Sequence, residues 1–146
     1  LQMLRAYQTA YIWPNGFHVN GDYKRYGYSF YDYEPFTMEA ECGFTAAVNE
    51  LLMQSWGGRL RIFPAVPETW RNVRFQNLRA EGGVLVSAEM REGEVESATV
   101  ESPEGGEVKV VWPLGRVAPG APHEVRTLKL SAGDRKELVG MPHPAP

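Results

Sequence analysis

The sequence is poor in the residues that build disulfides and metal sites. Its 146 residues include one cysteine, Cys42, and three scattered histidines. One cysteine allows no disulfide within the chain, and the histidines have no companion at ligand spacing, so we expect no metal and no cofactor. A thiol near a helix N-terminus can be reactive, but for Cys42 we predict a small buried side chain.

Long apolar runs and runs of positive charge are also absent. No stretch of about 18 apolar residues is present to cross a bilayer, and no signal-peptide pattern is found. The formal net charge is -3, which gives no electrostatic reason to bind nucleic acid or an anionic membrane. We therefore expect neither as a partner, and localisation stays open between secreted and cytoplasmic.

What is present begins with a helical segment, predicted over residues 1–57. Residues 1–13 have the apolar spacing of a helix. A second helix is predicted to start at Thr37 or Met38 and to end at Ser55. Its buried stripe is predicted to consist of Phe44, Val48, Leu51 and Leu52.

After Gly58 the apolar period changes from that of a helix to the alternation of strands. Short alternating segments follow one another, separated by the turn sequences EGG, REGE, PEGGE and SAGD. This pattern predicts an antiparallel β-sandwich of about seven strands over residues 58–140, followed by a flexible tail over residues 141–146. The predicted fold is mainly β, a sandwich preceded by two α-helices.

Two helices cannot bury so wide an apolar stripe alone. We expect the helical segment to dock on its own sandwich or to be the last piece of a larger helical domain. The chain begins at Leu1 inside a helical pattern, from which we expect a fragment. A stripe left uncovered would promote self-association.

The stretch PFTMEAECGFTAAVNELLMQS, residues 35–55, carries a resemblance to a known family. With the later PAVP, Trp70 and LRAEGG, it resembles the C-terminal region of the family 95 glycoside hydrolases, the inverting α-L-fucosidase and α-L-galactosidase group. The resemblance covers about 60 residues well. It implies that residues 1–57 are the end of an (α/α)6 catalytic barrel and that the sandwich is the C-terminal β region.

The resemblance also implies a role for Glu39, which occupies the place of the family's base-side carboxylate. Physically, a carboxylate at a helix N-terminus is favoured by the helix dipole, although a first-turn Glu that only stabilises the helix is an alternative. The family's Gly-Asn-Phe-Gly is Ala-Glu-Cys-Gly here, so Glu41 replaces an asparagine at the barrel mouth. The family's general acid lies upstream, so this chain alone is expected to be inactive.

The loop over residues 14–35 is long and dense in aromatic residues, which is typical of a functional segment. Tyrosine rings suit both the apolar faces and the hydroxyls of sugars, so a carbohydrate is the expected partner. The candidate sugar-binding residues are Trp13, Tyr23, Tyr26, Tyr28, Tyr31, Tyr33 and Glu41. The alternative is that the rings only pack between the helices and the sandwich.

Two other functions stay open. A stand-alone sugar-binding or galactose-mutarotase-like β-sandwich module is the first, although such sandwiches are usually about twice as long. A purely structural domain without a ligand is the second.

Overall fold

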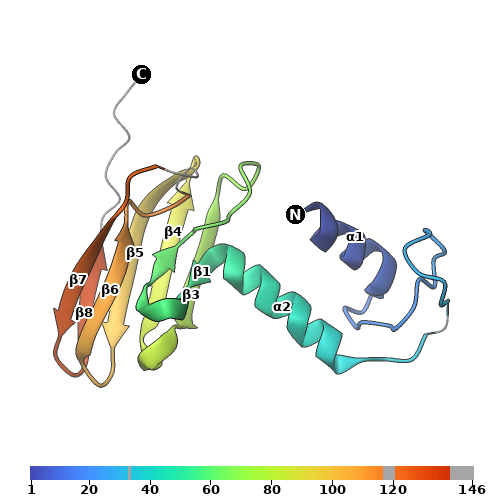
Figure 1. The fold of residues 1–146 in the computed structure, drawn as a ribbon, viewed down its shortest axis with the longest axis horizontal. Helices are drawn as coiled ribbons and strands as arrows, with labels where there is room; N and C mark the ends of the chain where they lie inside the picture. Colours follow the sequence, from blue (N-terminus) through green and yellow to red (C-terminus); the bar gives the residue numbers. More distant parts are fainter. Residues whose placement is uncertain (33, 117–120, 139–146) are drawn as a thin grey trace. The chain divides into compact units, whose positions relative to one another are not determined.

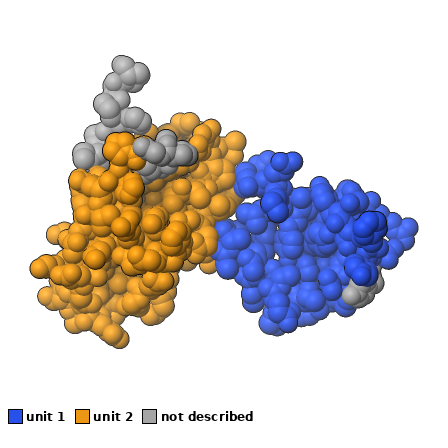
Figure 2. Space-filling model, viewed as in Figure 1, with its two compact units in different colours: residues 1–48 blue, residues 49–146 orange. Residues whose placement is uncertain are grey.

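The structure is a computed structural model that describes residues 1–32, 34–116 and 121–138. It consists of two compact units, Leu1–Val48 and Asn49–Pro146 (Figure 2). The boundary predicted between residues 57 and 58 stays a prediction. The predicted tail over residues 141–146 lies outside the described residues.

The first unit begins with helix α1, Gln2–Tyr11 (Figure 1). It ends two residues before the predicted Trp13, because Ile12 is already extended and forms a β-bridge with His18. A residue that precedes a proline also disfavours helical geometry, and Pro14 follows Trp13.

Helix α2, Met38–Leu52, ends three residues before the predicted Ser55. The residues predicted to form the last turn of this helix instead form strand β1, Met53–Gln54. This strand pairs with β2, Arg61–Ile62. The 3-10 turn η1, Trp56–Gly58, reverses the chain between them. Pairing Met53 with Ile62 places both side chains in the core, and this burial outweighs continuation of the helix.

The apolar stripe of α2 is not buried as predicted. No residue of α2 is buried, and the four stripe residues Phe44, Val48, Leu51 and Leu52 are all half-buried. Leu52 packs against the core of the second unit, and Phe44 stacks on Tyr7 in the first. The prediction of a fully buried stripe is therefore wrong for this chain.

The second unit is an antiparallel β-sandwich, as predicted. One sheet has four strands in the order β3-β4-β5-β8. Their bounds are Val73–Arg79, Leu85–Arg91, Glu94–Ser102 and Asp134–Leu138. The strands β6, Gly106–Trp112, and β7, Glu124–Leu130, form a separate antiparallel pair (Figure 1).

Alternation along the strands explains the core. In β4 and in residues 98–102 of β5 every second side chain is buried, and Val86 faces Val100 across the ladder with both fully buried. Val110 and Leu130 from the β6-β7 pair join the same cluster. Each sheet thus contributes one apolar face to a shared core, which is the packing of a sandwich.

Leu60 lies far from β6 in the sequence but adds to the β6-β7 pair. Leu60 forms a parallel bridge with Val110. Its N–H donates to the carbonyl of Lys109 at 2.8 Å, and its carbonyl accepts from the N–H of Val111 at 2.9 Å. Leu60, 3% exposed, is part of the core.

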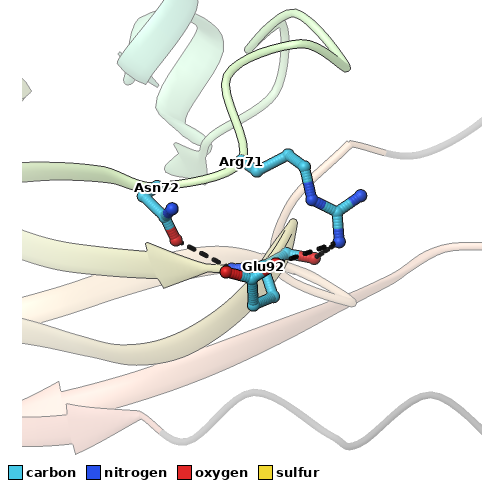
Figure 3. A network of polar contacts seen from close by, with 3 residues as sticks. All are labelled: Arg71, Asn72 and Glu92. Atoms are coloured by element: carbon cyan, nitrogen blue, oxygen red, sulfur yellow. Dashed lines mark hydrogen bonds and ion pairs between the residues drawn. The ribbon is translucent and has the colours of Figure 1, made fainter.

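A polar network fixes the turn between β4 and β5 (Figure 3). Arg71 donates to the backbone carbonyl of Glu92 at 2.6 Å, and Asn72 Oδ1 accepts from the N–H of Glu92 at 3.0 Å. The ion pair between the Arg71 and Glu92 side chains is exposed and adds little free energy. The backbone contacts hold the turn against the segment before β3.

Candidate functional site

Glu39 lies in the first turn of α2 and is exposed. The chain that leads to it is held by three backbone contacts with the segment His18–Asn20. The N–H of Asn20 donates to the carbonyl of Pro35 at 2.9 Å, Val19 forms a bridge with Phe36, and the N–H of Thr37 donates to His18 at 3.3 Å. The start of the helix is therefore anchored although Glu39 itself faces solvent.

A buried histidine strengthens this anchor. His18 is 5% exposed, and its Nδ1 is hydrogen-bonded to Oγ1 of Thr37. Its ring stacks on Tyr7 with centroids 5.3 Å apart and an interplanar angle of 10°. Burial lowers the pKa of His18, while Thr37 and the charge of Glu41 oppose this shift. His18 thus joins the start of α2 to an aromatic cluster on α1.

Glu41 faces this cluster rather than the surface that carries Glu39. Two positions apart on a helix, side chains do not share a face, and Glu41 is half-buried whereas Glu39 is exposed. Burial and then the charge of Glu41 raise the pKa of the Tyr7 phenol, whose oxygen is buried without a hydrogen-bond partner in the described chain. The structure therefore separates the two carboxylates that the sequence groups together.

Cys42 corrects another prediction. It is exposed, not buried. Cys42 lies three positions after Glu39, on the same side of α2, whereas Phe44 and Val48 occupy the half-buried side with Glu41. Helix geometry, and not the chemistry of the thiol, decides its exposure.

The aromatic loop is organised around Asp22, a residue that is 1% exposed. Its Oδ1 accepts the N–H of Tyr26 at 2.9 Å and its Oδ2 accepts the N–H of Tyr28 at 2.9 Å. Burial raises the pKa of the Asp22 carboxyl, but the backbone N–H groups of residues 26–29 outweigh it and hold the pKa below its usual range. Asp22 thus closes the base of the loop as an ionised acceptor.

The predicted sugar-binding rings divide into two groups. Tyr26, Tyr28 and Tyr31 are 56%, 58% and 69% exposed. Trp13 and Tyr23 are half-buried and lie against each other with centroids 6.0 Å apart. Packing against each other accounts for Trp13 and Tyr23, whereas the rings of Tyr26 and Tyr28 are exposed. Tyr33 lies outside the described residues.

Sequence reasoning did not single out two further features. Phe17 and Phe36, each half exposed, meet edge to face at 5.1 Å and are two further exposed rings of the first unit. Asp22 was not selected as the residue that organises the loop. An aspartate shortly before a glycine-containing turn is the local signal that identifies such a role.

The residues that the structure describes contain no group of three His, Cys, Asp or Glu side chains placed to hold a metal ion. None of the helices in this described part has the length and apolar character needed to cross a membrane.

Comparisons with known proteins agree with the resemblance seen in the sequence. Residues 54–133 match the family model described as glycoside hydrolase family 95, C-terminal domain. Alpha-L-fucosidase 2 of Arabidopsis thaliana is 44% identical over 69 residues, which are 47% of this chain and 8% of that protein. The chain therefore spans a small part of the length of this relative, and the family match lies in the second unit.

Proposed function

We propose that this chain, which belongs to glycoside hydrolase family 95, forms the carboxyl-terminal part of an α-L-fucosidase-like hydrolase and is catalytically incomplete by itself. The observation that carries this proposal is the family match over residues 54–133. Glu39 and the aromatic loop precede the matched range, so their roles depend on their geometry and on the resemblance of residues 35–55.

In this function Glu39 is the base-side carboxylate. Inverting hydrolysis needs one carboxylate to activate water while a carboxylic acid on the other side protonates the leaving oxygen. Glu39 is exposed in the first turn of α2, where the helix dipole stabilises negative charge. The contacts of Thr37 with His18 give the start of α2, and so the backbone that carries Glu39, a defined position.

The acid partner is supplied by a part of the enzyme outside this chain. The two carboxyl groups of an inverting site lie roughly 6.5–9.5 Å apart. Glu41 is on another face of α2, and Glu50 is about 16 Å further along the helix axis. Neither carboxylate of this helix suits the role, which favours an upstream helical barrel as the source of the acid.

The exposed tyrosines form the proposed contact with the sugar. Tyr26 and Tyr28 are held by the Asp22 carboxylate through their backbone N–H groups, so the backbone that carries their rings needs little further ordering when a ligand binds. Their exposed faces suit the C–H face of a sugar, and their hydroxyls suit its polar groups.

A substitution in the intact hydrolase tests the role of Glu39. Glu39→Gln keeps the shape of the side chain but removes the base, so hydrolysis of 4-nitrophenyl α-L-fucoside is expected to fall by about 10²–10⁴-fold. Glu50→Gln, another exposed substitution on α2, is the matched control and should retain activity. Equal activities of the two variants would remove Glu39 from the catalytic site.

Titration of the chain itself tests the aromatic loop. L-fucose, D-galactose and L-galactose are added separately while the ring signals of the tyrosines and tryptophans are followed by NMR. Saturable shifts of Tyr26 and Tyr28 are expected, with little change at the half-buried Trp13. Absence of these shifts with all three sugars would count against sugar binding by this loop.

The half-buried stripe of α2 is proposed to dock on neighbouring barrel helices in the intact enzyme. In the isolated chain the same surface is expected to promote self-association. Size-exclusion chromatography at rising concentration measures this, and a purely monomeric profile would contradict it. The mutarotase-like and ligand-free alternatives stay predictions, since no observation favours either.

A further inference from the structure

All three Gly-Gly pairs of the chain meet at one pocket in the second unit. They are Gly57–Gly58, Gly82–Gly83 and Gly105–Gly106. Each pair contributes at least one residue to the lining of a pocket of about 210 Å³, which we call the diglycine pocket. The first two pairs belong to η1 and to the second 3-10 turn η2, Glu81–Gly83, and the third consists of the last residue before β6 and the first residue of that strand.

The floor of the diglycine pocket is apolar and its rim is charged. Leu60 and Val84, which line it, are 3% and 6% exposed and belong to the core. Arg59, Glu81 and Lys109 also line it and are exposed. A ligand in this pocket meets an apolar surface on one side and charges of both signs at the edge.

Several polar groups of the lining have hydrogen-bonding capacity to spare. Ser55 Oγ accepts from the N–H of Glu81 at 3.0 Å, so its own hydroxyl proton can be donated elsewhere. Within residues 1–32, 34–116 and 121–138, no ion pair reaches Arg59, Lys109 or Glu81. The lining therefore offers donors and an acceptor that the described chain does not neutralise.

The glycines leave the wall of the pocket without side chains. A Cβ atom built at Gly58, Gly82 or Gly106 would meet nothing within 4 Å. The turns need positive φ at these positions, and the result is peptide backbone that a ligand can approach closely.

We propose that the diglycine pocket binds a single neutral sugar ring. Its volume is below the roughly 300–1,000 Å³ of pockets for drug-sized ligands, which favours one ring over a longer chain. A pyranose has an apolar face for Leu60 and Val84, and hydroxyls that both donate and accept for the charged rim and Ser55. The choice of a sugar rests on the proposed function, and every residue that lines the pocket lies within the family match.

NMR titration of the full chain labelled with ¹⁵N tests this site. With D-galactose, L-fucose and L-galactose as separate probes, the amides of Gly58, Gly82 and Gly106 are expected to shift saturably with at least one sugar. Gly93, in the turn between β4 and β5 and outside the pocket lining, is the internal control and should not shift.

Substitutions at the rim then show whether the pocket is the site. Arg59→Ala and Lys109→Ala are each expected to weaken binding by about tenfold, because each removes a charged hydrogen-bond donor. Lys136→Ala, an exposed lysine on β8 outside the lining, should leave the affinity unchanged. Undiminished binding in both rim variants would overturn the proposal.

The same titration separates this inference from the proposed function. Shifts of the Tyr26 and Tyr28 rings without shifts of the pocket glycines would overturn the pocket alone. Shifts of the pocket glycines without shifts of those rings would support the pocket and count against the loop. If the amide signals of the pocket glycines do not shift with any of the three sugars, the pocket proposal is overturned, whatever the activity of the intact hydrolase.

Discussion

The backbone N–H of Tyr28 donates to Oδ2 of Asp22 at 2.9 Å, across six positions of the chain. The same carboxylate accepts the N–H of Tyr26 through its other oxygen. One buried side chain thus fixes the backbone that carries two exposed aromatic rings. The surface proposed to bind a sugar depends on a residue that would not touch the sugar.

Asp22→Asn is expected to loosen the loop. The amide replaces one carboxylate oxygen by a donor, so one of the two N–H groups loses its acceptor. Hydrogen exchange at the amides of Tyr26 and Tyr28 should accelerate on the order of tenfold. Asp32→Asn removes only an exposed ion pair with Arg25 and should leave both rates unchanged.

Lowering the pH is expected to open the same loop. The folded-state pKa of Asp22 lies below its ordinary value of 3.8, so its contribution to stability is present above pH 3.8 and is lost as the pH falls through the folded pKa. Amide exchange at Tyr28, corrected for the intrinsic rate, should therefore show loop opening in that acidic window. The Asp22→Asn variant should lack this step, and a step of the same size in the variant would contradict the assignment.

His18 predicts a second dependence on pH, near neutrality. Burial lowers its folded-state pKa below 6.5, so the contribution of His18 to stability is fully present above pH 6.5 and is lost as the pH falls through the folded pKa. Urea unfolding followed by Tyr fluorescence on either side of that pH measures the decline.

His18→Gln should remove most of this pH dependence. His123→Gln alters an exposed histidine and serves as the matched control, which should keep the dependence. If both variants behave alike, His18 is not the group that titrates.

The centre of the sandwich is expected to depend on Phe63. This side chain is fully buried and meets Phe75 edge to face at 5.2 Å. Phe63→Ala should lower the free energy of unfolding by about 3–5 kcal/mol, since the cavity cannot be refilled by a well-packed neighbour. Phe30→Ala, at a fully exposed ring, should change it by less than about 0.5 kcal/mol, as measured by urea denaturation.

Gly105 is expected to tolerate no side chain. A Cβ atom there would lie 2.9 Å from the backbone nitrogen of Ala132, at a φ of +79°. Gly93 has a similarly positive φ of +88° but open space around it, so Gly93→Ala carries only the backbone strain of about 1–2 kcal/mol. Thermal unfolding should therefore show a larger loss for Gly105→Ala, and equal losses would contradict the close approach.

Alternation made most of the sandwich predictable. The segments predicted as strands around Val86 and Val100 are strands with the expected buried face, because a two-residue period fixes which side chains point inward. The end of α2 was not predictable from its own residues. Met53 and Gln54 suit a helix locally, and only pairing with Arg61 and Ile62 makes them a strand.

The candidate site was predicted less completely, for reasons of geometry. Helical periodicity predicted that Phe44 and Val48 share a side, but no sequence pattern says how deeply that side is covered. Glu39 and Glu41 look adjacent in the sequence, whereas helix geometry turns them apart. Two of the three Gly-Gly pairs, in EGG and PEGGE, are predicted as turns, and nothing local indicates that all three pairs meet at one pocket.

The bridge between Leu60 and Val110 has a consequence for the order in which the molecule is made. During synthesis Leu60 leaves the ribosome some fifty residues before its partner strand exists. The backbone groups of Leu60, next to the hairpin of β1 and β2, therefore lack their partners until β6 emerges. A nascent chain stalled before β6 should be a good substrate for chaperones, and one released beyond β7 should not.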